Sequence, residues 1–304
     1  MSVEEVITSI TNVVPNMMDA FGRLFPGIPQ RSLDKAELKA TQRMLDDIEK
    51  ATARCEEMGL SREFQASVIA DITKRHTRSE RFESVLCFAA GMNPDTSRVD
   101  DIEQDWIEDF QEHAEKACDE DMQRTWGAVL AGEMDAPGSF SKRTMDILSK
   151  MSKAEAESFR RLCGCATYLY VPGSEKGRSP EPVPGLEIDD DYASYNGGQI
   201  TAREIGILDS IGLIDSGRMT PLKIEPGFGY PFYTSDGIVL VRAKDDAGKV
   251  AVDFKSAIFT PSGTELASVC GIGGDPRLRQ VLIDKFSSAG LVVADFIDMS
   301  HDQT

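Results

Sequence analysis

Positive charge is scarce in this sequence. Of its 304 residues, 33 are Lys or Arg and 51 are Asp or Glu, which leaves a formal net charge of -18. Proteins that bind duplex DNA gain most of their affinity from Lys and Arg side chains that neutralise phosphates. Anionic membranes attract proteins through the same cations. The composition therefore disfavours both nucleic acid and membrane surfaces as partners, and the strong net charge favours solubility.

Long apolar runs and a secretory leader are also missing. No stretch approaches the roughly 20 apolar residues that a membrane span requires, and no basic segment with a cleavage site opens the chain. We therefore expect a cytoplasmic protein without a membrane span, in which the six cysteines stay reduced. Cys163 and Cys165 could together hold a metal, but no second Cys or His pair stands at ligand spacing, so buried structural thiols are the favoured interpretation. No metal and no cofactor is predicted.

Motifs of the common enzyme classes are absent: there is no Gly-x-Ser-x-Gly, no phosphate loop and no His-Glu-x-x-His. The strongest enzymatic pattern is Asp253-Phe254-Lys255 on an expected strand, with Asp236 before the preceding strand. Such acids can hold Mg²⁺ while the Lys positions the attacking water, as in metal-dependent nucleases. A solvated strand with alternating charge explains the pattern equally well. No catalytic residue is assigned, and a Mg²⁺-dependent nuclease remains the alternative function.

What is present predicts a folded, mainly α protein with a smaller α+β part. The chain is long enough for two domains, and 41% hydrophobic with 28% charged residues is typical of globular proteins. We expect an amphipathic helical segment at residues 1–30, a helical domain at 31–171 and a winged-helix-like module at 185–304. The boundary is placed in the loop from Pro172 to Pro184, which is rich in Gly, Pro and charge.

Apolar residues repeat at helical spacing from Val3 to Phe25, after a capping box formed by Ser2 and Glu5. Pro15 should kink or divide this helix. Its wide apolar face could pack on the protein's own core, on a second copy of the chain, or on a membrane interface. The core is favoured because apolar stripes are usually buried within their own domain, and the membrane is least favoured because Lys and Arg are missing. The width of the stripe also leads us to expect a homo-oligomer.

Two further helices are expected before residue 90. The first runs from Leu33 to Glu57 and ends at Gly59; Ser61 caps the second, which should be interrupted near His76. From Val99 to Asp135, thirteen acidic side chains are opposed only by Lys116 and Arg124. Most of the acidity therefore lies on two consecutive helices.

The pattern changes after the boundary loop. Capping boxes at Ser152–Glu155 and Thr201–Glu204 begin helices, and Thr260 begins another. Ile238–Arg242 and Val250–Ile258 are expected to pair as a β-hairpin. Helix, hairpin, helix is the order of many winged-helix modules. The helix that starts at Thr201 has only Arg203 as a cation, whereas a helix that recognises DNA bases should carry several Arg, Lys, Asn or Gln side chains.

The most distinctive run is DEDMQRTWGAVLAGE at residues 119–133, followed by PGSFSKRT at residues 137–144. It resembles the signature of a bacterial family, domain-of-unknown-function family 2806, in which Gln-x-x-Trp-Ala-x-x-Leu-Ala-Gly-Glu precedes Pro-Gly-Ser-Phe-Ser-x-Arg-Thr. The sequence departs from that signature at Cys118, where the family often has a capping Ser, and at Gly127, where Ala is usual. The resemblance implies no known activity.

Each residue of this motif has a plausible packing role. Trp126 is close in sequence to small residues such as Gly132. Pro137 and Gly138 suit a turn, and Ser139 or Ser141 can cap the next helix. The alternative is a ligand or partner site formed by Gln123, Glu133, Ser139 and Arg143. Together these observations predict a non-catalytic binding or regulatory protein that acts through protein–protein contacts.

Overall fold

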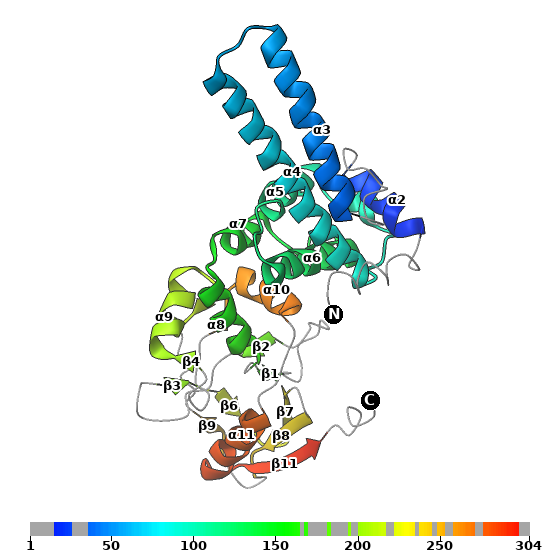
Figure 1. Cartoon of the computed structure of the whole chain (residues 1–304). Coiled ribbons are helices and arrows are strands. Elements are labelled where there is room, and N and C mark those ends of the chain that lie inside the picture. The colour runs from blue at the N-terminus through cyan, green and yellow to red at the C-terminus, as the bar shows by residue number, and fades with distance from the viewer. Residues whose placement is uncertain are drawn as a thin grey trace. The chain divides into compact units, whose positions relative to one another are not determined.

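The computed structural model describes residues 15–25, 36–164, 167–169, 181–183, 194–195, 200–216, 222–234, 237–244, 248–252, 258–270 and 276–297. The chain forms two compact units, Met1–Ser149 and Lys150–Thr304. The first unit is helical, whereas the second combines helices with short strands (Figure 1). The prediction of a mainly α protein with a smaller strand-containing part toward the C-terminus is confirmed. The division between the units precedes the Pro172–Pro184 loop, most of which lies outside the described residues.

Successive helices build the first unit. They are α2 (Pro15–Leu24), α3 (Ala36–Glu57), α4 (Arg62–Gly91), the 3-10 turn η2 (Val99–Asp101), α5 (Gln104–Ala114), α6 (Glu120–Asp135) and α7 (Lys142–Lys150). The two acidic helices expected between Val99 and Asp135 are α5 and α6. Asp119 caps α6 by accepting a hydrogen bond from the Met122 amide at 3.1 Å, so the cap lies one residue after Cys118.

Helices α3 and α4 form a long antiparallel hairpin that extends away from α5, α6 and α7 (Figure 1). Gly59 turns the chain with φ at +65°, a value that favours glycine, and Ser61 accepts a hydrogen bond from the Phe64 amide at 3.3 Å. Both features were predicted. The expected break near His76 is wrong, because α4 runs without interruption from Arg62 to Gly91 and contains no Gly or Pro before its last residue.

The core of the first unit is an aromatic cluster. The Phe110 ring stacks on Trp106 with the ring centroids 5.1 Å apart, and it meets Trp126 edge-on at 5.6 Å. Phe82 of α4 lies 6.2 Å from Phe110. Such pairs bury large apolar rings in favourable geometry, so they hold α4, α5 and α6 together.

Helix α2 packs on this core through the C-terminal part of the N-terminal apolar stripe. Met17, Ala20, Phe21 and Leu24 are buried, and the Phe25 ring lies 5.0 Å from Phe82. These side chains are therefore used within the unit and are not available to a second copy. Pro15 is the first residue of the helix, a position where its missing N–H costs nothing. The capping box predicted at Ser2 and Glu5 lies outside the described residues.

The second unit contains four helices in its described part: α8 (Lys153–Gly164), α9 (Ala202–Ser210), α10 (Pro261–Val269) and α11 (Pro276–Ser288). Its strands are β1 (Thr167–Leu169), β2 (Glu181–Val183), β3 (Ser194–Tyr195), β4 (Ile200–Thr201), β5 (Ile214–Asp215), β6 (Leu222–Ile224), β7 (Gly229–Thr234), β8 (Gly237–Arg242), β9 (Val250–Val252), β10 (Ile258–Phe259) and β11 (Val292–Ile297). The capping boxes predicted at α8 and α9 are both present.

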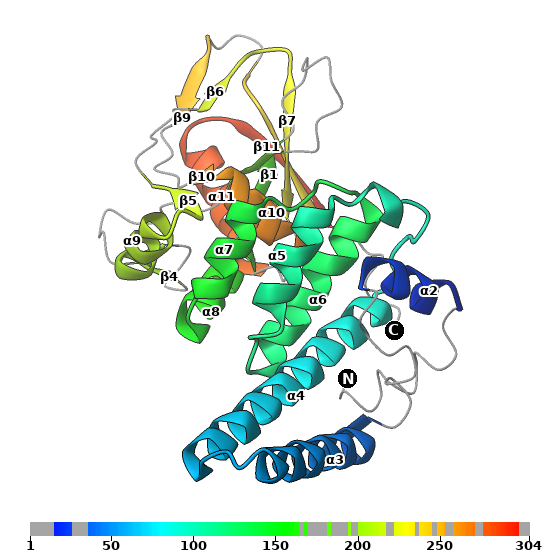
Figure 2. The same ribbon diagram turned by 90° about the horizontal axis from the view of Figure 1, so that it is seen from above.

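Five strands form an antiparallel sheet in the order β11-β8-β7-β1-β2. Helix α11 covers one face of this sheet (Figure 2), and its Leu282 and Phe286 are buried among Phe232, Val239 and Val241. Strand β11 follows α11 directly in the chain. Alternating burial along β8 shows that one face of the strand is in this core.

The predicted hairpin between Ile238–Arg242 and Val250–Ile258 is wrong. Strand β8 pairs with β7 on one side and with β11 on the other, so no edge remains for the following run. That run contains two short strands, of which β9 pairs with β6 and β10 pairs with β5. Local β propensity indicates that a strand forms but does not indicate its partner. The winged-helix assignment is no longer supported by this hairpin and stays a prediction.

None of the helices in the described part of the chain combines the length and the hydropathy that a membrane crossing needs.

Candidate functional site

The two parts of the signature motif meet at Glu133. This side chain is only 2% exposed, and its carboxylate accepts hydrogen bonds from the backbone amides of Gly138 at 2.5 Å and Phe140 at 2.9 Å. Gly138 has φ at +89°, which explains the glycine in the turn. Glu133 thus ties the loop after α6 to the helix itself.

Other motif residues secure the same loop. The Trp106 indole donates a 2.7 Å hydrogen bond to the Phe140 carbonyl. Ser141 caps α7 by accepting a hydrogen bond from the Thr144 amide at 3.3 Å, whereas the Ser139 hydroxyl donates to the Ala136 carbonyl at 2.5 Å. Of the two predicted caps, Ser141 is the one observed.

The alternative binding set consists of side chains that mostly serve this local structure. The Gln123 amide donates to the Ala117 carbonyl at 3.1 Å, and Glu133 and Ser139 bond to the backbone as described. Arg143 lies exposed on α7. These placements favour a structural role for the motif, and a ligand site at these four residues stays a prediction.

Gly127 allows α6 to lie directly against α4. A Cβ at this position would come 2.6 Å from the Cβ of Phe88 and 2.9 Å from the backbone nitrogen of Ala89. Both views show the two helices side by side (Figures 1 and 2). Gly127, which replaces the usual Ala of the family pattern, therefore permits the close packing of α6 against α4.

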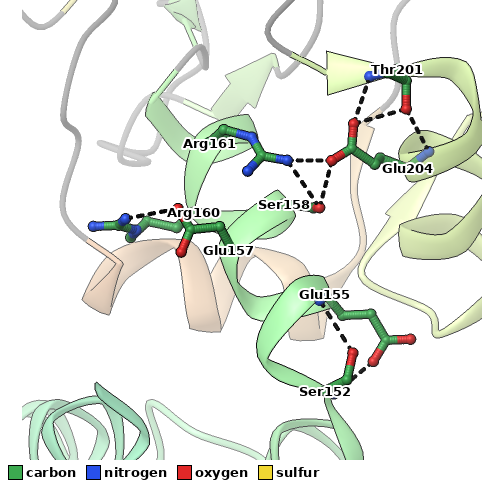
Figure 3. Close-up of polar contacts among 8 residues, drawn as sticks. All are labelled: Ser152, Glu155, Glu157, Ser158, Arg160, Arg161, Thr201 and Glu204. Atoms are coloured by element: carbon green, nitrogen blue, oxygen red, sulfur yellow. Dashed lines mark hydrogen bonds and ion pairs between the residues drawn. The ribbon is translucent and has the colours of Figure 1, made fainter. Parts of the chain in front are cut away.

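In the second unit, Glu204 is the centre of a polar cluster that joins α8 to α9 (Figure 3). Its carboxylate accepts hydrogen bonds from the Thr201 amide and hydroxyl, both at 2.8 Å, and from the Ser158 hydroxyl at 2.8 Å. Arg161 forms an ion pair with the same carboxylate. The backbone hydrogen bond from Thr201, reinforced by Ser158 and Arg161, lowers the pKa of Glu204 to about 2. A carboxylate with so low a pKa is a weak base toward the Ser158 hydroxyl, and its contacts to Ser158, Arg161 and Thr201 fasten α8 to α9.

A surface groove lies between α3 and α4 on the hairpin of the first unit. It has a volume of about 370 Å³ and is lined by Asp47, Lys50, Ala51, Arg54, Ile72, Arg75 and His76. Ala51 and Ile72 are half-buried and form its apolar part. The His76 ring approaches the Asp47 carboxylate, with Nε2 at 3.0 Å from Oδ2. This groove is not evident from the sequence alone: the spacing of residues 47, 50, 51 and 54 indicates one helix face, but not which face of α4 lies opposite.

The positive charge of the groove comes from Lys50, Arg54 and Arg75. Lys50, Arg54 and Arg75 are exposed and make no ion pair within the described part of the chain. By contrast, each cation in the following list has a carboxylate partner: Arg23, Arg78, Arg98, Lys116, Arg124 and Lys142. The groove therefore brings together three cations that have no carboxylate partner in the described part of the chain.

The hairpin also exposes large apolar side chains. Met58 at the tip is 64% exposed, Phe64 at the start of α4 is 51% exposed, and Leu45 on α3 is 51% exposed. These three side chains therefore meet solvent.

Comparison with known proteins bears on the motif. Residues 71–176 match the model of a family described as protein of unknown function (DUF2806). The similarity to that family covers this part of the chain. The resemblance seen in the sequence is thereby confirmed for a region that extends from the middle of α4 to beyond α8 and leaves α3 outside. Searches of curated proteins and of solved structures each gave no match.

The remaining predicted sites are the alternative nuclease residues and the cysteine pair. Asp236, Asp253 and Lys255, the residues of the alternative nuclease site, lie outside the described residues, as does Cys165. Cys163 is buried at the end of α8. Within the described residues, no group of three or more His, Cys, Asp or Glu side chains is placed to hold a metal ion.

Proposed function

We propose that this chain is a non-catalytic binding or regulatory protein that acts through protein–protein contacts, with the α3–α4 hairpin as its contact arm. The observation that carries this proposal is the burial pattern of the arm. Between residues 41 and 81, all of which are described, Cys55 is the single buried residue. Helices in proteins gain most of their stability from packing an apolar face. A helix pair this exposed therefore leaves surface that a partner can cover.

The chemistry of the arm suits a protein surface. Exposed Leu45, Met58 and Phe64 offer apolar contacts, and Met is common at adaptable binding surfaces. Charged side chains around them would form the polar rim of an interface. A second copy of the chain is one partner of this kind, which keeps the expected homo-oligomer within the proposal. We also propose a cytoplasmic setting, and a winged-helix-like second unit that holds protein surfaces instead of DNA.

The arm can be tested with the full chain carrying Leu45→Ser, Met58→Ser and Phe64→Ser together. Proteins that co-purify from the native host are quantified by mass spectrometry, and light scattering measures self-association. We expect at least one partner, or the oligomer itself, to be lost with the triple variant. Phe228→Ser with Phe296→Ser is the matched control, since these side chains are 51% and 54% exposed in the second unit. If all three proteins retain the same partners and the same mass, the arm is not the contact surface.

The competing nuclease function is tested separately. The purified chain with Mg²⁺ or Mn²⁺ should leave DNA and RNA intact. Cleavage that disappears in both Asp253→Ala and Lys255→Ala would overturn the non-catalytic proposal and assign the reaction to those residues.

A further inference from the structure

We propose that the groove between α3 and α4 is a binding site for a small polyanion that carries phosphate or carboxylate groups. The positive charges come from both helices of the hairpin. Lys50 and Arg54 are four residues apart on α3, so they lie on the same helix face one turn from each other. Arg75 reaches the groove from α4. An oxyanion between the two helices could therefore meet cations on both sides.

The side chains that line the groove match oxyanion chemistry. A guanidinium presents several N–H donors in a planar fork that fits phosphate or carboxylate oxygens, and a Lys ammonium adds a compact charge. None of the three cations is neutralised by a carboxylate within the described part of the chain, so binding an anion breaks no existing ion pair there. The single acid of the groove, Asp47, is engaged by His76.

The size of the groove favours a small molecule. Small-molecule sites typically occupy about 300 to 1,000 Å³ and combine apolar surface with a few convergent polar groups. The groove has about 370 Å³, with Ala51 and Ile72 as its apolar part. A ligand with a compact anionic head and a short apolar portion would meet all of these groups at once.

Titration calorimetry on the full chain, in low salt and without phosphate buffer, tests the site with two probes, inorganic pyrophosphate and citrate. Saturable binding of either probe is expected, and the tighter probe identifies the class of oxyanion. Arg54→Ala and Arg75→Ala should each weaken binding about tenfold, the loss that corresponds to one charge-assisted hydrogen bond. Asp47→Asn should strengthen binding, because it removes the one negative charge of the groove. Opposite signs from neighbouring positions cannot arise from a general loss of folding.

Lys74→Ala is the matched control. Lys74 is exposed and adjacent to Arg75 in sequence, but it does not line the groove. Binding that is unchanged in this variant supports the site. Failure of both probes to saturate, or an equal loss in Lys74→Ala and Arg75→Ala, would overturn it. The site is independent of the apolar contact surface, so the variant at Leu45, Met58 and Phe64 should bind the probe as the wild type does.

Discussion

The carboxylate of Glu133 lies 2.9 Å from the backbone amide of Phe140, and this bond joins the two halves of the family signature. Glu133 ends the Leu-Ala-Gly-Glu part on α6, and Phe140 belongs to the Pro-Gly-Ser-Phe part of the loop. The acid and the loop therefore form one structural device. The bonds from the loop to Glu133 fix the position of α7 relative to α6, which agrees with a packing role for the motif.

Glu133→Ala should lower the free energy of unfolding by about 3 kcal/mol, because it removes charge-assisted hydrogen bonds and leaves the Phe140 amide unpaired inside the protein. Urea denaturation measures the change. Glu133→Gln keeps the shape and one acceptor oxygen, so its loss should be smaller. Wild-type stability in the Ala variant would show that the loop does not depend on this carboxylate.

Trp126→Ala should be among the most damaging changes in the first unit. The side chain is 1% exposed and contacts Phe110, and truncating a buried aromatic residue costs roughly 3 to 5 kcal/mol. Thermal melting should show a large drop in Tm. Arg143→Ala, on the exposed face of α7, is the control and should change Tm little. A variant that melts normally but loses a partner would instead make Trp126 part of a binding surface.

Gly127→Ala and Gly206→Ala should have opposite effects although both lie inside helices. At Gly127 the new methyl group meets α4 at 2.6 Å, so overpacking of about 1 to 3 kcal/mol should outweigh the better helix propensity of Ala. At Gly206 a Cβ meets nothing within 4 Å, so propensity alone should add about 0.5 to 1 kcal/mol. Chemical denaturation of the two variants checks the signs. A stabilised Gly127→Ala would mean that α4 and α6 pack less closely.

The Glu204 cluster should make stability depend on pH in the acid range. Its pKa lies near 2 in the folded chain, below its usual 4.5, so its stabilising contribution is complete above about pH 4.5. The contribution is lost as the pH falls from there toward 2. The difference in unfolding free energy between wild type and Glu204→Gln should therefore shrink across that interval. A difference that stays constant would indicate that the carboxylate is not held ionised by Thr201, Ser158 and Arg161.

Local elements were readable from the sequence because their signals are local. The hydrogen bonds of the capping boxes at Ser152 and Thr201 form within one helical turn, and Gly59 supplies a backbone angle that few other residues adopt. The acidic helices and the buried Trp126 also follow from periodicity and composition. For the same reason, the family motif and the packing roles of its residues can be predicted from the sequence alone.

Strand partners and the candidate site depended on contacts between distant segments. Strand β8 pairs with β7 and with β11 because α11 and the sheet bury Val239 and Val241 together, and no local pattern encodes that pairing. Likewise, Phe25 at the end of the apolar stripe packs against Phe82, which lies far along the chain.

The sequence by itself determined the helical class, the caps, the acidity and the family of the central region, since each depends on composition or on neighbours within a few residues. Only the tertiary structure decided that Glu133 accepts hydrogen bonds from the loop, that the hairpin is exposed, and that Arg54 and Arg75 line the same groove. The physical reason is that exposure and charge convergence are properties of packed helices, whose relative rotation is set by side chains along the whole seam.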